Sequence, residues 1–216
     1  MLSVTLHRVL HVGVHELTPD SANMRWLHFA EQGGDPWVLP IWRAVNEAAA
    51  AGRVAPRPRA LSELGVHIST RLNFLPRIVQ RISAETEALI RVAKERRQYH
   101  EFAPGNPGRA LIVDNDLKYR LLVDVDALLF ELNSLYELWM EWFRSLHRHA
   151  LVPMPCRTAN DSIRHILATE GHSTDWLDHL NDDRNYFTHR AAPYLAMDIS
   201  TARYDVLFLK STVIDL

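Results

Sequence analysis

The sequence predicts an all-α protein, a helical bundle with two long antiparallel helices and short β strands near both termini. Two long stretches carry apolar residues at helical spacing, which favours a bundle. The two ends of the chain are instead rich in β-branched residues, as strands are. We expect an N-terminal extension packed on the bundle (residues 1–60), a helical domain (61–200) and a C-terminal strand or tail (201–216).

The composition is typical of a soluble intracellular protein. The 216 residues suffice for one substantial domain, with 47% hydrophobic and 23% charged residues. A net charge of −2 argues against coating nucleic acid by bulk electrostatics. The single Cys156 fits a reducing cytoplasm. Five acids between Leu121 and Leu146 argue against a membrane helix, so we expect a cytoplasmic protein without a membrane partner.

The N-terminal extension shows a strand pattern followed by two short helical patterns. "SVTLHRVLHVGVHEL" is partly alternating and predicts a strand. A helix is expected over Ser21–Gln32, where two glycines stop it. The next helix is expected from about Leu39 to Gly52, because Pro40 suits a first helical turn. "GRVAPRPRALSELG" (residues 52–65), with two prolines in a basic run, is the best linker candidate.

Two long helices are predicted to form the middle of the chain. The first is expected from near Pro76 to about Tyr99, and its basic end suits the helix dipole. The second is centred on Leu121–Leu146, where apolar residues alternate steps of four and three. Its apolar face is too wide for a two-stranded coiled coil and predicts the middle of a bundle, with its tryptophans in the core.

Shorter elements are predicted in the remainder of the chain. A helix fits Asn160–Glu170, with Gly171 as its stop. A second helical pattern runs from Ser173 to Pro193, although residues 181–183 ("NDD") could begin a fresh helix there. "ARYDVLFLKST" (residues 202–212) predicts a strand, which could pair with the N-terminal one.

The candidate site lies in "LNDDRNYFTHRAAPY" (residues 180–194). On a helix, Asn185 and His189 are four residues apart and share one face. The long side chain of Arg184 can converge on the same point, while Tyr186 and Phe187 point elsewhere and can anchor the helix in the core.

Histidine exchanges a proton near neutral pH, and arginine suits a phosphate and the charge that builds in phosphoryl transfer. With no ligand spacing for a metal around them, metal-independent RNA cleavage is the natural hypothesis. The ribose 2′-OH would attack the phosphate, with His189 as acid or base and Arg184 steadying the charge. One histidine serves poorly in both roles, and a symmetric dimer would supply a second. Arg190 is the candidate for substrate contact, and no cofactor is predicted.

Arg-Asn, three more residues and His ("RNYFTH") resembles the R-x4-H motif of the HEPN superfamily, late in a helical bundle as in that family. The resemblance covers about residues 68–199 and rests on Arg184, Asn185 and His189; "RAAPYLAMDIS" looks like a bacterial branch. It implies a HEPN-like bundle, a homodimer through the motif helix and often a metal-independent RNase, with many members in toxin or antiviral defence systems. Other members are inactive modules for dimerisation or nucleotide binding. Ala191 stands where one toxin subgroup has a tyrosine, which argues against silencing through such a tyrosine.

Structural interpretations compete with these functional ones. His165, His172 and His179 recur every seven residues, but Gly171 breaks the helix between them, so no metal site is predicted. An acid on the long helix, Asp126 or Glu131, could orient Arg184, and the sequence does not choose between them. A basic cluster at the end of the first long helix is better explained by a solvated helix end than by RNA binding; it comprises Arg91, Lys94, Arg96 and Arg97. A third hypothesis is a structural assembly subunit that docks through its terminal strands.

Overall fold

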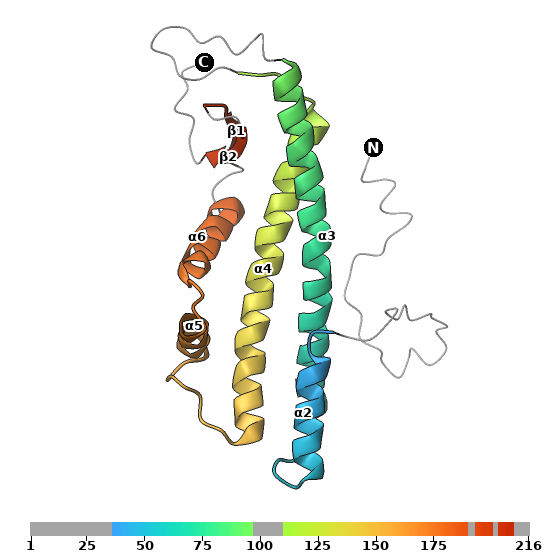
Figure 1. The fold of residues 1–216 in the computed structure, drawn as a ribbon, viewed down its shortest axis with the longest axis vertical. Coiled ribbons are helices and arrows are strands. Elements are labelled where there is room, and N and C mark those ends of the chain that lie inside the picture. The colour runs from blue at the N-terminus through green and yellow to red at the C-terminus, as the bar shows by residue number, and fades with distance from the viewer. Residues whose placement is uncertain (1–35, 97–109, 190–192, 201–202, 210–216) are drawn as a thin grey trace, which may run out of the picture. The chain divides into compact units, whose positions relative to one another are not determined.

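A computed structural model of the chain describes residues 36–96, 110–189, 193–200 and 203–209; of residues 188 and 189 it describes the backbone. These ranges belong to one compact unit, Asp35–Leu216. Within them the chain forms five helices and then one antiparallel pair of strands (Figure 1). The predicted all-α class with a small amount of β structure is confirmed in this part of the chain. The predicted strand at residues 3–17 and the helix at residues 21–32 lie outside the described residues.

The centre of the unit is a pair of long antiparallel helices, α3 (Arg59–Glu95) and α4 (Asn115–Ala150), which lie side by side in Figure 1. Two ion pairs show their direction, because Arg71 contacts Glu131 whereas Arg81, further along α3, contacts the earlier Asp124. α4 also contacts the two helices that follow it. The prediction that this helix occupies the middle of a bundle is therefore confirmed.

The start of α3 corrects one prediction. The helix begins at Arg59 instead of near Pro76, so the second half of the predicted linker is helical and Pro76 lies inside the helix. An interior proline costs about 3 kcal/mol through its lost hydrogen bond and its clash with the preceding turn. Burial of Leu61 and Ile68, which are 2% and 1% exposed, returns about 1.5–3 kcal/mol each. The apolar residues before the proline thus outweigh its cost.

Helix α2 (Leu39–Ala50) begins where the sequence predicted, with a proline in its first turn. It packs on the first half of α3 through Trp42, whose ring lies edge-on to Trp142 of α4 at 5.9 Å between centroids. Before the helix, the Trp37 Nε1–H group donates a hydrogen bond to Asn73 Oδ1 on α3 at 3.2 Å. These contacts make one apolar cluster from three helices.

Gly65 allows the close approach of α2 to α3. A Cβ atom at this position would lie 2.4 Å from Cζ2 of Trp42, so one of the two must shift. We expect Gly65→Ala to destabilise the protein by about 1–3 kcal/mol through overpacking. The higher helix propensity of alanine offsets about 1 kcal/mol of this cost. Urea unfolding measures the effect. In a Trp42→Leu background the same substitution should cost less, and equal costs in both backgrounds would contradict the proposed contact.

Helices α5 (Ala159–Thr169) and α6 (Asp175–His189) follow α4 and pack against it. The bounds of α5 match the prediction within one residue at each end. Its N-terminus is capped by Thr158, whose hydroxyl accepts from the Asp161 N–H at 3.0 Å. Gly171 then takes a φ of 79°, which a residue with a side chain rarely adopts, and this turns the chain into α6.

Strand β1 (Tyr194–Asp198) pairs antiparallel with β2 (Asp205–Leu209), from Tyr194 opposite Leu209 to Asp198 opposite Asp205. The strand predicted at residues 202–212 is thus confirmed over its middle, but its partner here is β1, which the sequence did not predict. Apolar side chains from both strands pack on a second core cluster around Leu121; they are Leu195, Met197, Val206 and Phe208.

None of the described helices combines the length and the apolar character that crossing a bilayer requires. The predicted domain boundaries near residues 60 and 200 stay predictions.

Candidate functional site

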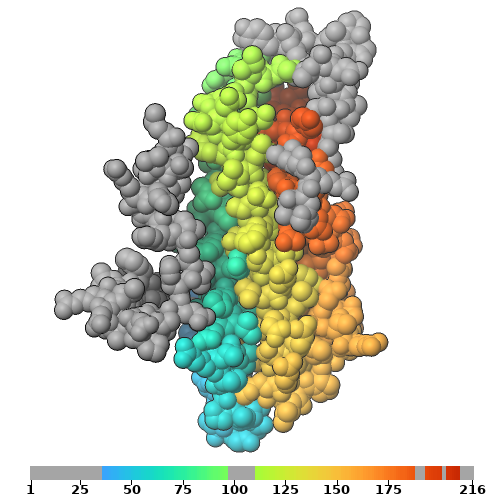
Figure 2. Space-filling model, turned by 180° about the vertical axis from the view of Figure 1, so that it is seen from behind, coloured from blue at the N-terminus to red at the C-terminus, as the bar shows by residue number. Residues whose placement is uncertain are grey.

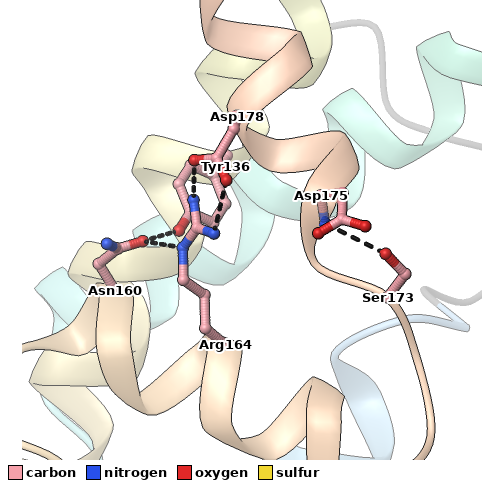
Figure 3. A network of polar contacts seen from close by, with 6 residues as sticks. All are labelled: Tyr136, Asn160, Arg164, Ser173, Asp175 and Asp178. Atoms are coloured by element: carbon pink, nitrogen blue, oxygen red, sulfur yellow. Dashed lines mark hydrogen bonds and ion pairs between the residues drawn. The ribbon is translucent and has the colours of Figure 1, made fainter.

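Helix α6 carries the predicted motif and runs unbroken from Asp175 to His189. Its first turn is marked by the Asp175 N–H, which donates to the Ser173 hydroxyl at 3.2 Å (Figure 3). No helix therefore begins at residues 181–183. A helix N-terminus, with its partial positive charge, is not available beside Arg184, and any phosphate there would have to be held by side chains.

Arg184 and Asn185 lie side by side on the half-buried part of α6. Arg184 follows the buried Leu177 by seven residues, about two turns, and so lies in the same row of the helix. Its Nη1–H group donates to Asn185 Oδ1 at 3.5 Å. Asn185 and His189 are one turn apart in the next row, as predicted. Arg190 lies outside the described residues.

Phe187 anchors the C-terminal half of α6. Its ring lies 6.3 Å from that of Phe208 on β2, so the helix end is held against the strand pair. Leu180, two turns earlier in the same row of the helix, is 7% exposed. Phe187 therefore holds the motif helix in the core, as the sequence predicted; Tyr186 is half-buried.

The N-terminal half of α6 is fixed by a polar network that joins three helices (Figure 3). Arg164 of α5 donates from Nη2 to Asp178 Oδ1 at 2.7 Å and from Nη1 to Asp178 Oδ2 at 3.2 Å. Its Nε donates to Asn160 Oδ1 at 3.3 Å, and the Tyr136 hydroxyl of α4 donates to the same amide oxygen. Such a two-pronged arginine–carboxylate pair fixes orientation as well as distance.

The network shifts the proton affinities of its members. The hydrogen bonds from Arg164 lower the pKa of Asp178 below its ordinary value, and the same bonds raise the pKa of Arg164. Burial raises the pKa of Tyr136, against the opposing charge of Arg164. Asp178 is thus ionised and Tyr136 neutral near pH 7. This network escaped sequence reasoning, because residues fourteen apart on two helices carry no spacing signal.

We expect Asp178→Asn to destabilise the protein at pH 7 and to destabilise it less at pH 3, which lies below the unfolded pKa of the carboxyl group. A carboxyl group whose folded pKa is lowered stabilises the fold above its unfolded pKa, about 3.9, and loses this effect as pH falls through the folded pKa. Urea midpoints at both pH values measure the difference. Asp182→Asn, at an exposed position one turn later, is the matched control. An equal loss for Asp178→Asn at both pH values would contradict the ion-pair account.

The two acids considered as partners for Arg184 differ in the structure. Glu131 forms a hydrogen-bonded ion pair with Arg71 of α3, so its carboxylate is already engaged. Asp126 lies at an exposed position of α4. The contact with Arg71 thus explains the position of the Glu131 carboxylate without any role in the motif, and the acid that would orient Arg184 stays unassigned.

Two residues of the basic cluster at the end of α3 have structural contacts of their own. Lys94 Nζ lies 5.3 Å from the centre of the Tyr204 ring, and Arg96 donates to the carbonyl oxygen of Ile112. His165 and His179 lie on different helices, with His172 in the turn between them. Among the described residues, no group of three or more His, Cys, Asp or Glu side chains is arranged to hold a metal ion.

Comparison of the chain with protein-family models, curated proteins and solved structures finds no match. The resemblance to the HEPN superfamily thus rests on the motif and its helical setting.

Proposed function

We propose that this chain is a metal-independent endoribonuclease of the HEPN type. The observation that carries the proposal is the unbroken course of α6, which sets Asn185 and His189 one turn apart and brings the Arg184 guanidinium to Asn185. In the proposed reaction the ribose 2′-oxygen loses its proton and bonds to phosphorus. The bond from phosphorus to the 5′-oxygen breaks, and that oxygen takes up a proton. The products are a 2′,3′-cyclic phosphate and a 5′-hydroxyl.

Each motif residue has a distinct part in this proposal. His189 accepts or supplies the transferred proton, since imidazole does both near neutral pH. Arg184 balances the charge that builds on the phosphate oxygens, and Asn185 holds its guanidinium group by the amide oxygen. Arg190 contacts the RNA backbone beside the motif.

The charge of α6 favours one direction of approach for RNA. Asp175 and Asp182 lie at exposed positions in the N-terminal two thirds of the helix, where they repel a phosphate backbone. RNA should therefore approach the C-terminal end of α6, which carries His189 and is followed by Arg190.

A homodimer completes the proposed site. One histidine cannot be general base and general acid in the same step, whereas a two-fold pair of α6 helices supplies His189 twice. We further propose that the enzyme acts in the cytoplasm, in a toxin–antitoxin or antiviral defence system, where an antitoxin or defence partner protein restrains it.

The alternative is a catalytically inactive HEPN module that dimerises and binds a nucleotide or a partner protein. Two features favour it. Arg184 is half-buried, and neither of the two open grooves between α3 and α4 is lined by Arg184 or Asn185.

Cleavage of labelled RNA by the purified full chain in EDTA distinguishes the two functions. The ribonuclease proposal expects fragments that end in a 2′,3′-cyclic phosphate, and their loss in Arg184→Ala. Asn185→Ala tests the second motif residue in the same assay, and Asn181→Ala, at an exposed position on the same helix, is its matched control. Absence of cleavage, or equal cleavage by Arg184→Ala and the wild type, would leave the inactive module as the better account.

A further inference from the structure

Two open grooves lie between α3 and α4, on a single face of the helical pair. In the first groove α3 contributes His67 and Phe74, and in the second it contributes Arg81 and Ala88. These four residues follow each other at intervals of seven, about two helical turns, and so form one row along the helix. We call the surface that carries both grooves the α3–α4 face. Figure 2 shows α3 and α4 side by side along the surface seen from behind.

Helix α4 contributes a matching row with large apolar side chains. Asp116 and Val123 line the second groove and Glu137 the first, and Phe130 completes this series at intervals of seven. Val123 is 64% exposed, Phe130 53% and Phe74, across the groove, 45%. The Arg71 guanidinium lies 6.0 Å from the centre of the Phe130 ring. Apolar side chains that gather on one exposed face mark an interaction surface.

The α3–α4 face carries an excess of negative charge. Its two grooves are lined by seven carboxylates and three arginines. Arg71 and Arg81 are taken up by ion pairs with Glu131 and Asp124. Oε2 of Glu85 is buried without a hydrogen-bond partner among the described residues, and burial, followed by the charge of Asp124, raises the pKa of this carboxyl. Glu141 is paired with Arg144. The groove carboxylates for which no ion pair is described, Glu85, Asp114, Asp116 and Glu137, favour a cationic occupant.

We propose that the α3–α4 face binds an amphipathic helix of a partner protein, with an apolar stripe flanked by lysine or arginine. The apolar stripe covers Phe74, Val123 and Phe130, and the basic flanks meet the groove carboxylates. Because the rows on α3 and α4 both repeat every seven residues, an occupant with the same repeat keeps contact along the whole face.

Charge argues against two other occupants of this face. A second copy of this chain would set an acidic face against an identical acidic face, which costs free energy. RNA is a polyanion and is repelled in the same way. The inference therefore concerns a protein partner and does not depend on the proposed ribonuclease activity.

The test uses a synthetic peptide as the probe. A fluorescein-labelled helical peptide of several heptads, with leucine on one face and lysine on its flanks, is titrated with the full chain and followed by fluorescence anisotropy. We expect saturable binding that weakens with added salt. Phe130→Ser and Val123→Glu should each weaken it by about tenfold or more, as expected when a central apolar contact is lost. Trp176→Ser on α6, where the side chain is 48% exposed, should bind as the wild type does.

Two control peptides and one measurement on the protein alone decide between the occupants. A peptide with glutamate flanks and a scrambled lysine peptide without an apolar face should not bind. Equal binding of the scrambled peptide, or unchanged binding by Phe130→Ser, would overturn the proposal. So would a dimer in sedimentation that is lost in Phe130→Ser and excludes the peptide, since the face would then belong to a second copy.

Discussion

Replacing His189 with alanine is expected to lower the rate of RNA cleavage by about 10²–10⁴-fold, the usual contribution of a positioned general acid or base. The unbroken helix α6 places this residue at the helix end, one turn beyond Asn185. In the proposed dimer the single substitution removes both copies of the proton-transfer group. The rate is measured with a labelled RNA in EDTA under single-turnover conditions.

His179→Ala is the matched control, because His179 lies on the same helix at an exposed position outside the motif. It should cleave at the wild-type rate. Arg184→Lys should fall between the wild type and Arg184→Ala, since lysine keeps the charge and loses the planar fork of donors. If His189→Ala cleaves as fast as His179→Ala, His189 is not the proton-transfer group.

Some of the fold could be predicted because the deciding interactions are periodic in sequence. Helix α4 presents apolar residues to neighbours on two sides, so its stripe is regular and wide. Its N-terminus is also locally encoded, since the Asp114 carboxylate accepts from the Asp116 N–H at 2.7 Å. The start of α2 was equally readable, because a proline is tolerated in the first turn and disfavoured later.

Other features depend on tertiary contacts that no local pattern contains. The proline rule placed the start of α3 too late because the residues that outweigh Pro76 are buried by other helices. Strand β1 was missed because five residues after the motif helix carry little signal until β2 pairs with them. Long-range pairing decides both cases.

For the candidate site, too, the sequence predicts some features and not others. The one-turn spacing of Asn185 and His189 follows from the sequence once α6 is helical. The sequence did not decide whether the helix breaks at residues 181–183, because Asp182 suits a helix cap as well as an exposed position within a helix. Packing of Leu177 and Leu180 in the core accompanies the continuous course. Arg164 holds the same half of α6 by its pair with Asp178.

Replacing Trp142 with alanine is expected to destabilise the protein by about 3–5 kcal/mol, the range for a large buried aromatic side chain. Trp142 is 5% exposed and joins three helices, since it belongs to the cluster formed with Trp42 of α2 and Leu61 of α3. This loss is a large part of the 5–15 kcal/mol that usually stabilises a domain. Urea unfolding followed by circular dichroism measures it.

Two neighbouring substitutions separate packing from chemistry at this position. Trp139→Ala, three residues earlier and 40% exposed, should cost clearly less, because folding removes less of this side chain from water. Trp142→Phe should cost less than Trp142→Ala, since it keeps an aromatic ring in place and leaves a smaller cavity. It also removes an indole N–H that is buried without an acceptor among the described residues. Both variants remove the indole N–H group, but only Trp142→Phe keeps an aromatic ring. Equal destabilisation by the two variants would therefore mean that the N–H group forms a hydrogen bond that matters to the three-helix cluster.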